Sequence, residues 1–188
     1  MSAPVELPDI VSRALNLSRT RGFVTSSRSE TGRLLAALAA SRTGTLGECG
    51  TGCGVGAAWL SSGAREGSRV ITTELDPALA DAVSAIFADD PRVEVITGDW
   101  TALRNHRPFS LVFLDVRDAK HSGADLVSEL LEPGGVAVMD DFTPCSTWPP
   151  MYEGRVDSMR EQWLTDPRFT TVEVMVASDT AVLIASRR

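Results

Sequence analysis

The chain has 188 residues, of which 43% are apolar and 23% charged, and its net charge is −7. This length and composition are typical of a single globular domain and exclude a disordered chain. The negative charge argues against a protein that binds the phosphate backbone of nucleic acids. No run approaches the roughly 20 apolar residues needed to span a bilayer, which argues against a membrane protein.

The N-terminal sequence MSAPVELPDI lacks the basic-then-apolar order of a secretion signal. The chain has three cysteines, an odd number that gives no disulfide framework. Both features favour reduced thiols in the cytoplasm.

Residues 1–44 are expected to form a helical segment that acts as a lid on a core at 45–188. Within it, leucines at helical spacing predict a helix over 26–41, and Ser27 with Glu30 matches a capping box. The segment carries six arginines and three acidic residues. It is therefore either a solvated helix face or a lid that meets an anionic ligand.

From residue 45 onward, apolar strand-like runs alternate with helical patterns, which predicts a parallel sheet covered on both faces. The last 20 residues hold two β-rich runs around a short turn at Ser178 and Asp179, so they should form an antiparallel hairpin. The expected fold is a Rossmann-like, mostly parallel α/β sheet in a single domain. Strands are expected at 45–49, 69–74, 92–98, 109–116 and 135–141, and helices at 56–64, 76–90 and 122–135.

The segment LGECGTGCGVG follows directly from the first strand and has glycine at every second position. A glycine-rich turn between a strand and a helix lets a ligand approach the backbone, which predicts a nucleotide-like ligand. Gly52, Gly54 and Ala57 also fit a dinucleotide pattern, so a nicotinamide cofactor is the alternative. Glu48, just before Gly50, is placed to meet a cationic amino group or is a buried hydrogen-bonded carboxylate.

Further candidates for ligand binding lie at the ends of the next strands. Glu74 can accept hydrogen bonds from both ribose hydroxyls, and Asp99 can accept one from an adenine amino group. Their neighbours Leu75, Gly98 and Trp100 complete the expected contacts, with Asp115 at the end of the fourth strand. The structural alternatives are a helix cap for Glu74 and a turn residue for Asp99.

Together these motifs resemble the class I S-adenosylmethionine-dependent methyltransferases, and most closely the catechol and caffeoyl-CoA O-methyltransferases. The matching segments run from SETGRLLAALA to the closing hairpin and include VITTELDP, VITGDW, FSLVFLDV and LLEPGGVAVMDD. The resemblance implies that the glycine loop holds the methionine part of S-adenosylmethionine, Glu74 the ribose and Asp99 the adenine.

The resemblance also implies a divalent ion such as Mg²⁺, bound by Asp115, Asp140 and Asp141. The family usually has asparagine where this chain has Asp141. Three carboxylates this close require a bound cation, a proton on one of them, or one that turns away. Asp141 could alternatively cap or turn the loop that follows it.

The family's lysine three residues after the strand-four aspartate is replaced here by Asp118, and Lys120 is the only lysine in the chain. Lys120 is therefore the candidate base, beside Asp115, and His121 and Asp118 are its rivals. A solvated lysine in the loop before the helix is the alternative.

The expected acceptor is a small planar molecule, because aromatic residues follow strand five. The prolines of this segment predict a loop over the active site or a homodimer contact. A metal-independent or N-directed methyltransferase, a non-catalytic homologue and a nicotinamide-dependent reductase are the competing functions. The aromatic and sulfur-containing candidates are Phe142, Trp148, Met151 and Tyr152, with Trp163 expected in the core.

Overall fold

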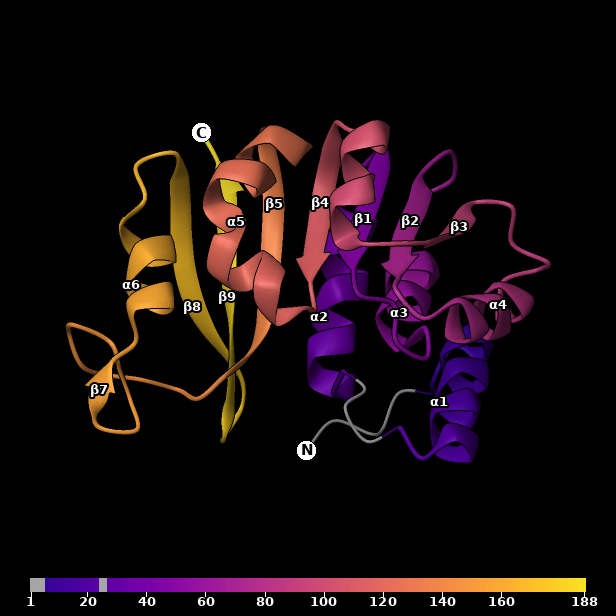
Figure 1. Ribbon diagram of the computed structural model, residues 1–188, viewed down its shortest axis with the longest axis horizontal. Helices are drawn as coiled ribbons and strands as arrows, with labels where there is room; N and C mark the ends of the chain where they lie inside the picture. The colour runs from indigo at the N-terminus through magenta and orange to yellow at the C-terminus, as the bar shows by residue number, and fades with distance from the viewer. Residues whose placement is uncertain (1–5, 24–26) are drawn as a thin grey trace.

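The computed structural model describes residues 6–23 and 27–188. Its main feature is a seven-stranded sheet in the order β3-β2-β1-β4-β5-β9-β8 (Figure 1). β9 is antiparallel to both β5 and β8, whereas the pairs from β3 to β5 are parallel. The predicted mostly parallel sheet with a C-terminal hairpin is thus confirmed. The strands are β1 Thr45–Cys49, β2 Arg69–Glu74, β3 Val93–Thr97, β4 Phe109–Leu114, β5 Leu131–Phe142, β8 Phe169–Ala177 and β9 Thr180–Arg187.

Helices cover both faces of the sheet, and each face has its own apolar core. In Figure 1, α5 and α6 lie in front of the strands and α2 and α3 behind them. A separate two-stranded hairpin, which the sequence did not predict, precedes α6 and consists of β6 Met151–Tyr152 and β7 Arg155–Val156. The helices are α1 Asp9–Arg21, α2 Ser29–Ala40, α3 Val55–Gly63, α4 Pro77–Ile86, the 3₁₀ helix η1 Trp100–His106, α5 Arg117–Leu130 and α6 Ser158–Thr165.

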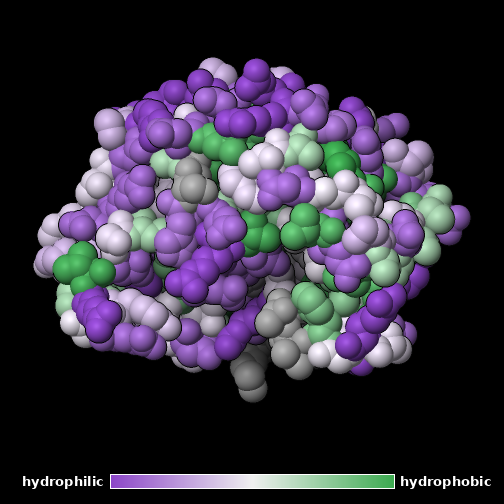
Figure 2. All heavy atoms as spheres, in the orientation of Figure 1, coloured by the Kyte–Doolittle hydropathy of each residue, from purple (hydrophilic) through white to green (hydrophobic). Residues whose placement is uncertain are grey.

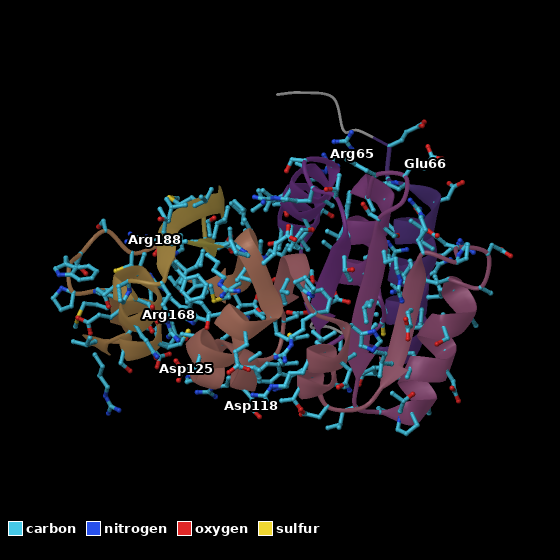
Figure 3. The ribbon with its side chains drawn as sticks, turned by 90° about the horizontal axis from the view of Figure 1, so that it is seen from above. Arg65, Glu66, Asp118, Asp125, Arg168 and Arg188 are labelled. Atoms are coloured by element: carbon cyan, nitrogen blue, oxygen red, sulfur yellow. The ribbon has the colours of Figure 1, made fainter. Side chains whose placement is uncertain are left out.

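An ion-pair cluster ties the turn between α6 and β8 to the neighbouring helix. The guanidinium of Arg168 lies 2.6 Å from Asp166 and 2.5 Å from Asp125 of α5. Figure 3 views the molecule from above and labels Arg168 and Asp125 near each other. The pair with Asp125 is exposed, and exposed ion pairs contribute little to stability, so packing decides how α5 meets this turn.

The capping box predicted at the start of α2 does not form. The N-cap of α2 is Arg28, in an extended conformation and without a side-chain capping bond, so Ser27 lies one residue too early to cap the helix. Ser27 instead lines a cavity at the end of the sheet. Val24, Thr25 and Ser26 lie outside the described residues, and with them part of the expected lid and of the predicted helix.

The predicted bounds of α5 are also wrong at both ends. The helix begins at Arg117 rather than at residue 122, and it ends at Leu130, before Pro133 and Gly134, because β5 already starts at Leu131. The buried residues Ala119, Val127 and Leu130 pack on the sheet from one side of this helix. Lys120 therefore lies in a helix rather than in a loop.

Gly63 marks the closest approach of α2 and α3. A Cβ atom built on Gly63 would lie 2.1 Å from the carbonyl oxygen of Ala36 and 2.7 Å from its Cα. The neighbouring atoms are backbone, so they cannot swing away as a flexible side chain would. The two helices pack with their backbones nearly in contact at this point.

We expect Gly63→Ala to lower the free energy of unfolding by about 1–3 kcal/mol, because the added methyl forces α2 and α3 apart. Chemical denaturation measures the change. Ser62→Ala is the control on the same helix, since Ser62 is exposed and its hydroxyl, within the described residues, bonds only to the carbonyl of Trp59. Equal stability of the two variants would show that the helices are not in close contact at Gly63.

Candidate active site

Three adjoining cavities follow the carboxyl ends of the parallel strands. A cavity of about 160 Å³ lies at the ends of β2 and β3, one of about 240 Å³ at the glycine loop, and one of about 440 Å³ beside α5 and α6. The first two share Gly50, Glu74 and Val116, and the last two share Asp115 and Asp141. We call them the adenine-side cavity, the loop cavity and the acceptor-side cavity, after the ligand parts that the sequence analysis expects there. Ligands of open α/β sheets bind at this edge.

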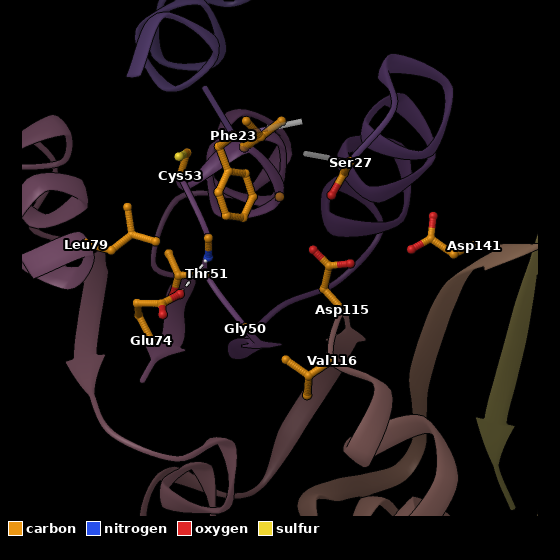
Figure 4. A pocket seen from close by; sticks show the side chains of 13 residues that line it. Phe23, Ser27, Gly50, Thr51, Cys53, Glu74, Leu79, Asp115, Val116 and Asp141 are labelled. Carbon is orange, nitrogen blue, oxygen red and sulfur yellow. Dashed lines mark hydrogen bonds between the residues drawn. The ribbon is translucent and has the colours of Figure 1, made fainter. Parts of the chain in front are cut away.

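The glycine loop forms the floor of the loop cavity (Figure 4). Gly50, Gly52 and Gly54 all have positive φ, at 91°, 51° and 81°, which explains why glycine stands at these positions. A Cβ atom on Gly50 would lie 2.4 Å from Cγ1 of Val116. The ring of Phe23, from the segment after α1, lies over Gly52, so a Cβ there would be 3.1 Å from it. A ligand can thus approach the backbone of the glycine loop closely, beneath the ring of Phe23.

Glu74 ends β2 and faces the glycine loop. Its Oε2 accepts a hydrogen bond of 2.8 Å from the amide of Gly52, and its Oε1 accepts one of 3.0 Å from the amide of Asp76. The N-cap of α4 is Asp76, which accepts from Ala78 and Leu79. Glu74 is therefore not the helix cap, and its half-buried carboxylate lines both the loop cavity and the adenine-side cavity.

Asp99 is the N-cap of η1 and also lines the adenine-side cavity. Its Oδ1 accepts hydrogen bonds from the amide and the hydroxyl of Thr101, at 3.0 and 2.6 Å. These bonds hold the pKa of the carboxyl below its usual range. The predicted neighbours Leu75, Gly98 and Trp100 line the same cavity. The structure thus brings this predicted group together.

Glu48 lies deeper than the cavities and lines none of the three. Its side chain is fully buried below the start of α3, and a Cβ on Gly56 would lie 2.0 Å from its Oε1. Oε2 accepts a 2.5 Å hydrogen bond from the hydroxyl of Thr72, whose oxygen lies 2.5 Å from that of Thr51. Burial raises the pKa of Glu48 to about 8. Thr51 reaches the loop cavity, so Glu48 is linked to the site only through two hydroxyls.

The carboxylates of Asp115, Asp140 and Asp141 meet between the loop cavity and the acceptor-side cavity, with ligand atoms within 4.8 Å of one another. Asp115 follows β4. The register between β5 and β9 shifts at Met139–Phe142, and Asp141 has a φ of 65°. This irregularity re-aims the side chains at the end of β5, which explains how two consecutive residues reach one site.

Lys120 joins this acidic cluster from the first turns of α5. Its Nζ donates to the carbonyl oxygen of Asp140 at 2.9 Å and to Oδ1 of Asp140 at 3.2 Å, and lies 3.8 Å from Oδ2 of Asp141. Only 8% of Lys120 is exposed, so the predicted alternative of a solvated lysine is wrong. Burial and the neighbouring carboxylates raise the pKa values of both Asp115 and Asp140, while Lys120 opposes both shifts.

The acceptor-side cavity combines charged and aromatic walls. Arg117, His121 and Lys120 line it from α5, and Phe142 and Tyr152 line it from the segment predicted to hold the acceptor. Trp163 is 1% exposed, as expected for a core residue, and its Nε1 donates to the carbonyl of Lys120 at 2.9 Å. Trp148 is 65% exposed, Met151 is also exposed, and Asp118 lines the adenine-side cavity instead.

Phe23 and Arg160 are two wall residues that the sequence interpretation missed. Arg160 is 1% exposed; it donates to the carbonyl of Thr143 at 2.8 Å and forms an ion pair with Glu173 at 3.3 Å. Its guanidinium also lies 5.1 Å from the ring centre of Phe142. An arginine in a polar helix carries no sequence signal for burial, and Phe23 stands in a segment without periodicity.

The face of the molecule shown in Figure 2 is predominantly hydrophilic, with hydrophobic residues in small groups between the hydrophilic ones. None of the helices in the described part of the chain is long and apolar enough to cross a membrane.

The fold and the strand-end cavities are those of an α/β protein that binds its ligand at one edge of a mostly parallel sheet. The family described as "Methyltransferase domain" matches residues 48–142, just over half of the chain. The chain belongs to this methyltransferase family, which confirms the class that the sequence motifs indicated. No curated protein sequence matches the chain.

Solved methyltransferase structures share the whole fold. The O-methyltransferase TomG from Streptomyces achromogenes, in complex with SAM, is 21% identical, with a TM-score of 0.78 over 98% of this chain and 92% of that one. The O-methyltransferase from Bacillus cereus, in complex with SAH, is 19% identical, with a TM-score of 0.76 over 98% and 94%. A methyltransferase from Geobacter sulfurreducens is 19% identical, with a TM-score of 0.76 over 97% and 90%.

Proposed function

We propose that the protein transfers a methyl group from S-adenosylmethionine to a hydroxyl group of a small planar acceptor. The observation that carries this proposal is the row of three cavities, in which Glu74 stands between the first two and Asp115 between the last two. An extended donor molecule and a separate acceptor both have space along one edge of the sheet. The similar structures solved with SAM and SAH support this proposal.

The residues of the first two cavities fit the proposed donor. Glu74 presents a carboxylate that is already fixed by the amides of Gly52 and Asp76, so it can accept from ribose hydroxyls with little loss of side-chain entropy. Asp99 is ionised and fixed in the adenine-side cavity by Thr101. The positive φ angles of the loop keep its backbone free of side chains under Phe23.

The chain itself positions the acceptor and handles its proton. When bound, the donor supplies an electrophilic methyl group on a sulfonium. The acceptor oxygen forms the new C–O bond as the C–S bond breaks, and the hydroxyl proton leaves to a carboxylate or to water at the mouth of the acceptor-side cavity. Lys120 lies where it can stabilise the negative charge on the acceptor oxygen, and Phe142 and Tyr152 can hold a planar ring. The assignment of Lys120 as the base itself stays a prediction.

Glu74→Ala is expected to weaken S-adenosylhomocysteine binding by about 1–3 kcal/mol, because a hydroxyl pair loses a charged acceptor. Calorimetric titration measures the change. Glu94→Ala is the matched control, since Glu94 lies on β3, pairs with Arg69 at the surface and lines none of the three cavities. Equal loss in both variants would mean that Glu74 acts on the fold rather than on the ligand.

The sequence resemblance also predicts Mg²⁺ bound by Asp115, Asp140 and Asp141. The three carboxylates are close enough to bind a divalent ion, and such an ion would supply positive charge beside the acceptor oxygen. The amine of Lys120, however, already contacts two of the three residues. The cluster therefore does not fit a divalent ion while Lys120 keeps this position.

The competing functions are a nicotinamide-dependent reductase, an N-directed methyltransferase and a non-catalytic homologue. The short-chain reductases pair a tyrosine and a lysine four residues apart, whereas Tyr152 and Lys120, each the only one of its kind, stand 32 positions apart (152 − 120). Turnover of methyl-labelled S-adenosylmethionine with phenols, catechols and amines tests the rest. Label in an ether product supports the proposal. Label in an amine product, or none with any acceptor despite tight donor binding, would favour an N-directed enzyme or a non-catalytic homologue. The homodimer and the cytoplasmic location stay predictions.

A further inference from the structure

Lys120 is the only lysine in the chain, and it is buried in an acidic site. Every other side chain of its charge type is an arginine, whose planar guanidinium is broader than the compact ammonium of lysine. The carbonyl oxygen of Lys120 accepts from the indole of Trp163, a core residue, and its backbone amide bonds to the carbonyl of Val116. The turn that carries the amine is thus fixed from both sides.

The amine of Lys120 contacts three oxygen atoms of the aspartate cluster. It donates to the carbonyl and to a carboxylate oxygen of Asp140, at 2.9 and 3.2 Å, and lies 3.8 Å from a carboxylate oxygen of Asp141. Asp140 is 3% exposed, so its carboxylate has little access to water as an alternative partner. A buried carboxylate requires a compensating charge, and Lys120 provides it directly.

A divalent ion and this ammonium cannot share the cluster. Mg²⁺ requires oxygens at about 2.0–2.1 Å in octahedral geometry, and here two of its three carboxylates would be those that already bind Lys120. An ion at that place would lie within a few ångströms of an ammonium, where like charges in a partly buried site repel strongly. The ion enters only if Lys120 leaves.

We propose that Lys120 is the resident cation of the cluster formed by Asp115, Asp140 and Asp141, and that the protein acts on its acceptor without a divalent metal ion. This inference rests on the proposed methyl transfer. It has a consequence for the acceptor, because a metal ion can chelate two neighbouring hydroxyls, whereas two of the three N–H donors of Lys120 already bond to Asp140 and one is left for an acceptor oxygen. The structure therefore points to acceptors with a single ionisable hydroxyl, for which a second, adjacent hydroxyl brings no advantage.

The test is a titration with Mn²⁺, followed by the loss of free-ion signal in electron paramagnetic resonance. We expect no stoichiometric binding to the wild-type protein and binding of one ion to Lys120→Met, lost again when Asp140→Asn is added. Arg117→Met is the control, since Arg117 lines the same cavity but forms no ion pair with the three carboxylates in the described residues. Melting temperature and S-adenosylhomocysteine binding show whether each variant is folded.

A stoichiometric Mn²⁺ site in the wild-type protein would overturn the inference, as would a folded Lys120→Met that still binds no ion. Turnover gives a second, independent result: a chelator should leave wild-type activity unchanged, and a phenol should react within a few-fold of the matching catechol. Loss of activity in chelator would contradict the inference. Absence of turnover under every condition would contradict the proposed function instead, and the Mn²⁺ titration would still decide the role of Lys120.

Discussion

Lys120→Met is expected to reduce kcat about 100-fold or more, because it removes a fixed positive charge beside the oxygen that becomes negative during the reaction. The stem of methionine keeps much of the packing, so binding of S-adenosylhomocysteine should change little. The assay is run in chelator, since the variant is expected to admit a metal ion that could replace the lost charge.

Lys120→Arg separates two roles of this residue. Arginine keeps the charge but stays protonated, so it can stabilise an oxyanion but cannot accept a proton. If Lys120 is a fixed cation, the arginine variant should retain more activity than the methionine variant. If Lys120 is the base, both variants should be equally inactive. A methionine variant within a few-fold of the wild type would show that neither role applies.

Glu48→Gln is expected to change how stability depends on pH. Glu48 is fully buried, and its pKa rises from 4.5 to about 8 because burial disfavours the carboxylate. Between these two values the folded state binds more protons than the unfolded state, so the contribution of Glu48 to stability falls as pH rises through this window and levels off above pH 8. Glutamine does not titrate. The stability of the variant relative to the wild type should therefore increase by on the order of 2 kcal/mol between pH 6 and pH 8.5.

Chemical denaturation at several pH values measures this difference. Asp115 and Asp140 also have raised pKa values, so the wild-type protein should lose stability with pH for more than one reason. The difference between variant and wild type isolates Glu48. Glu94→Gln, at an exposed position, should show no such trend. A difference that stays constant across the range would mean that Glu48 is ionised in the folded protein.

The strand ends could be predicted from the sequence because apolar runs and glycines are local signals. β1 and β2 have the predicted bounds, and the groups around Glu74, Asp99 and Asp115 meet at one edge because parallel strands end there. The depth of Glu48 could not be predicted in the same way. Its burial depends on the first turn of α3, where Gly56 leaves room for the carboxylate.

The buried position of Lys120 also could not be predicted from local sequence signals. The segment RDAKHSGAD holds a glycine and few apolar residues, so periodicity places the helix start five residues too late. Packing of Ala119 on the sheet and of Trp163 against the backbone of Lys120 sets the true start. Both are long-range contacts. Because of these contacts the side chain of Lys120, which was expected to be solvated, is buried and pairs with Asp140.

Calorimetry can show whether the loop cavity and the adenine-side cavity together bind S-adenosylmethionine. The wild-type protein is titrated with S-adenosylhomocysteine and, separately, with NADP⁺. We expect one binding site for S-adenosylhomocysteine and no heat of binding for NADP⁺. Stoichiometric binding of NADP⁺ without a signal from S-adenosylhomocysteine would contradict it.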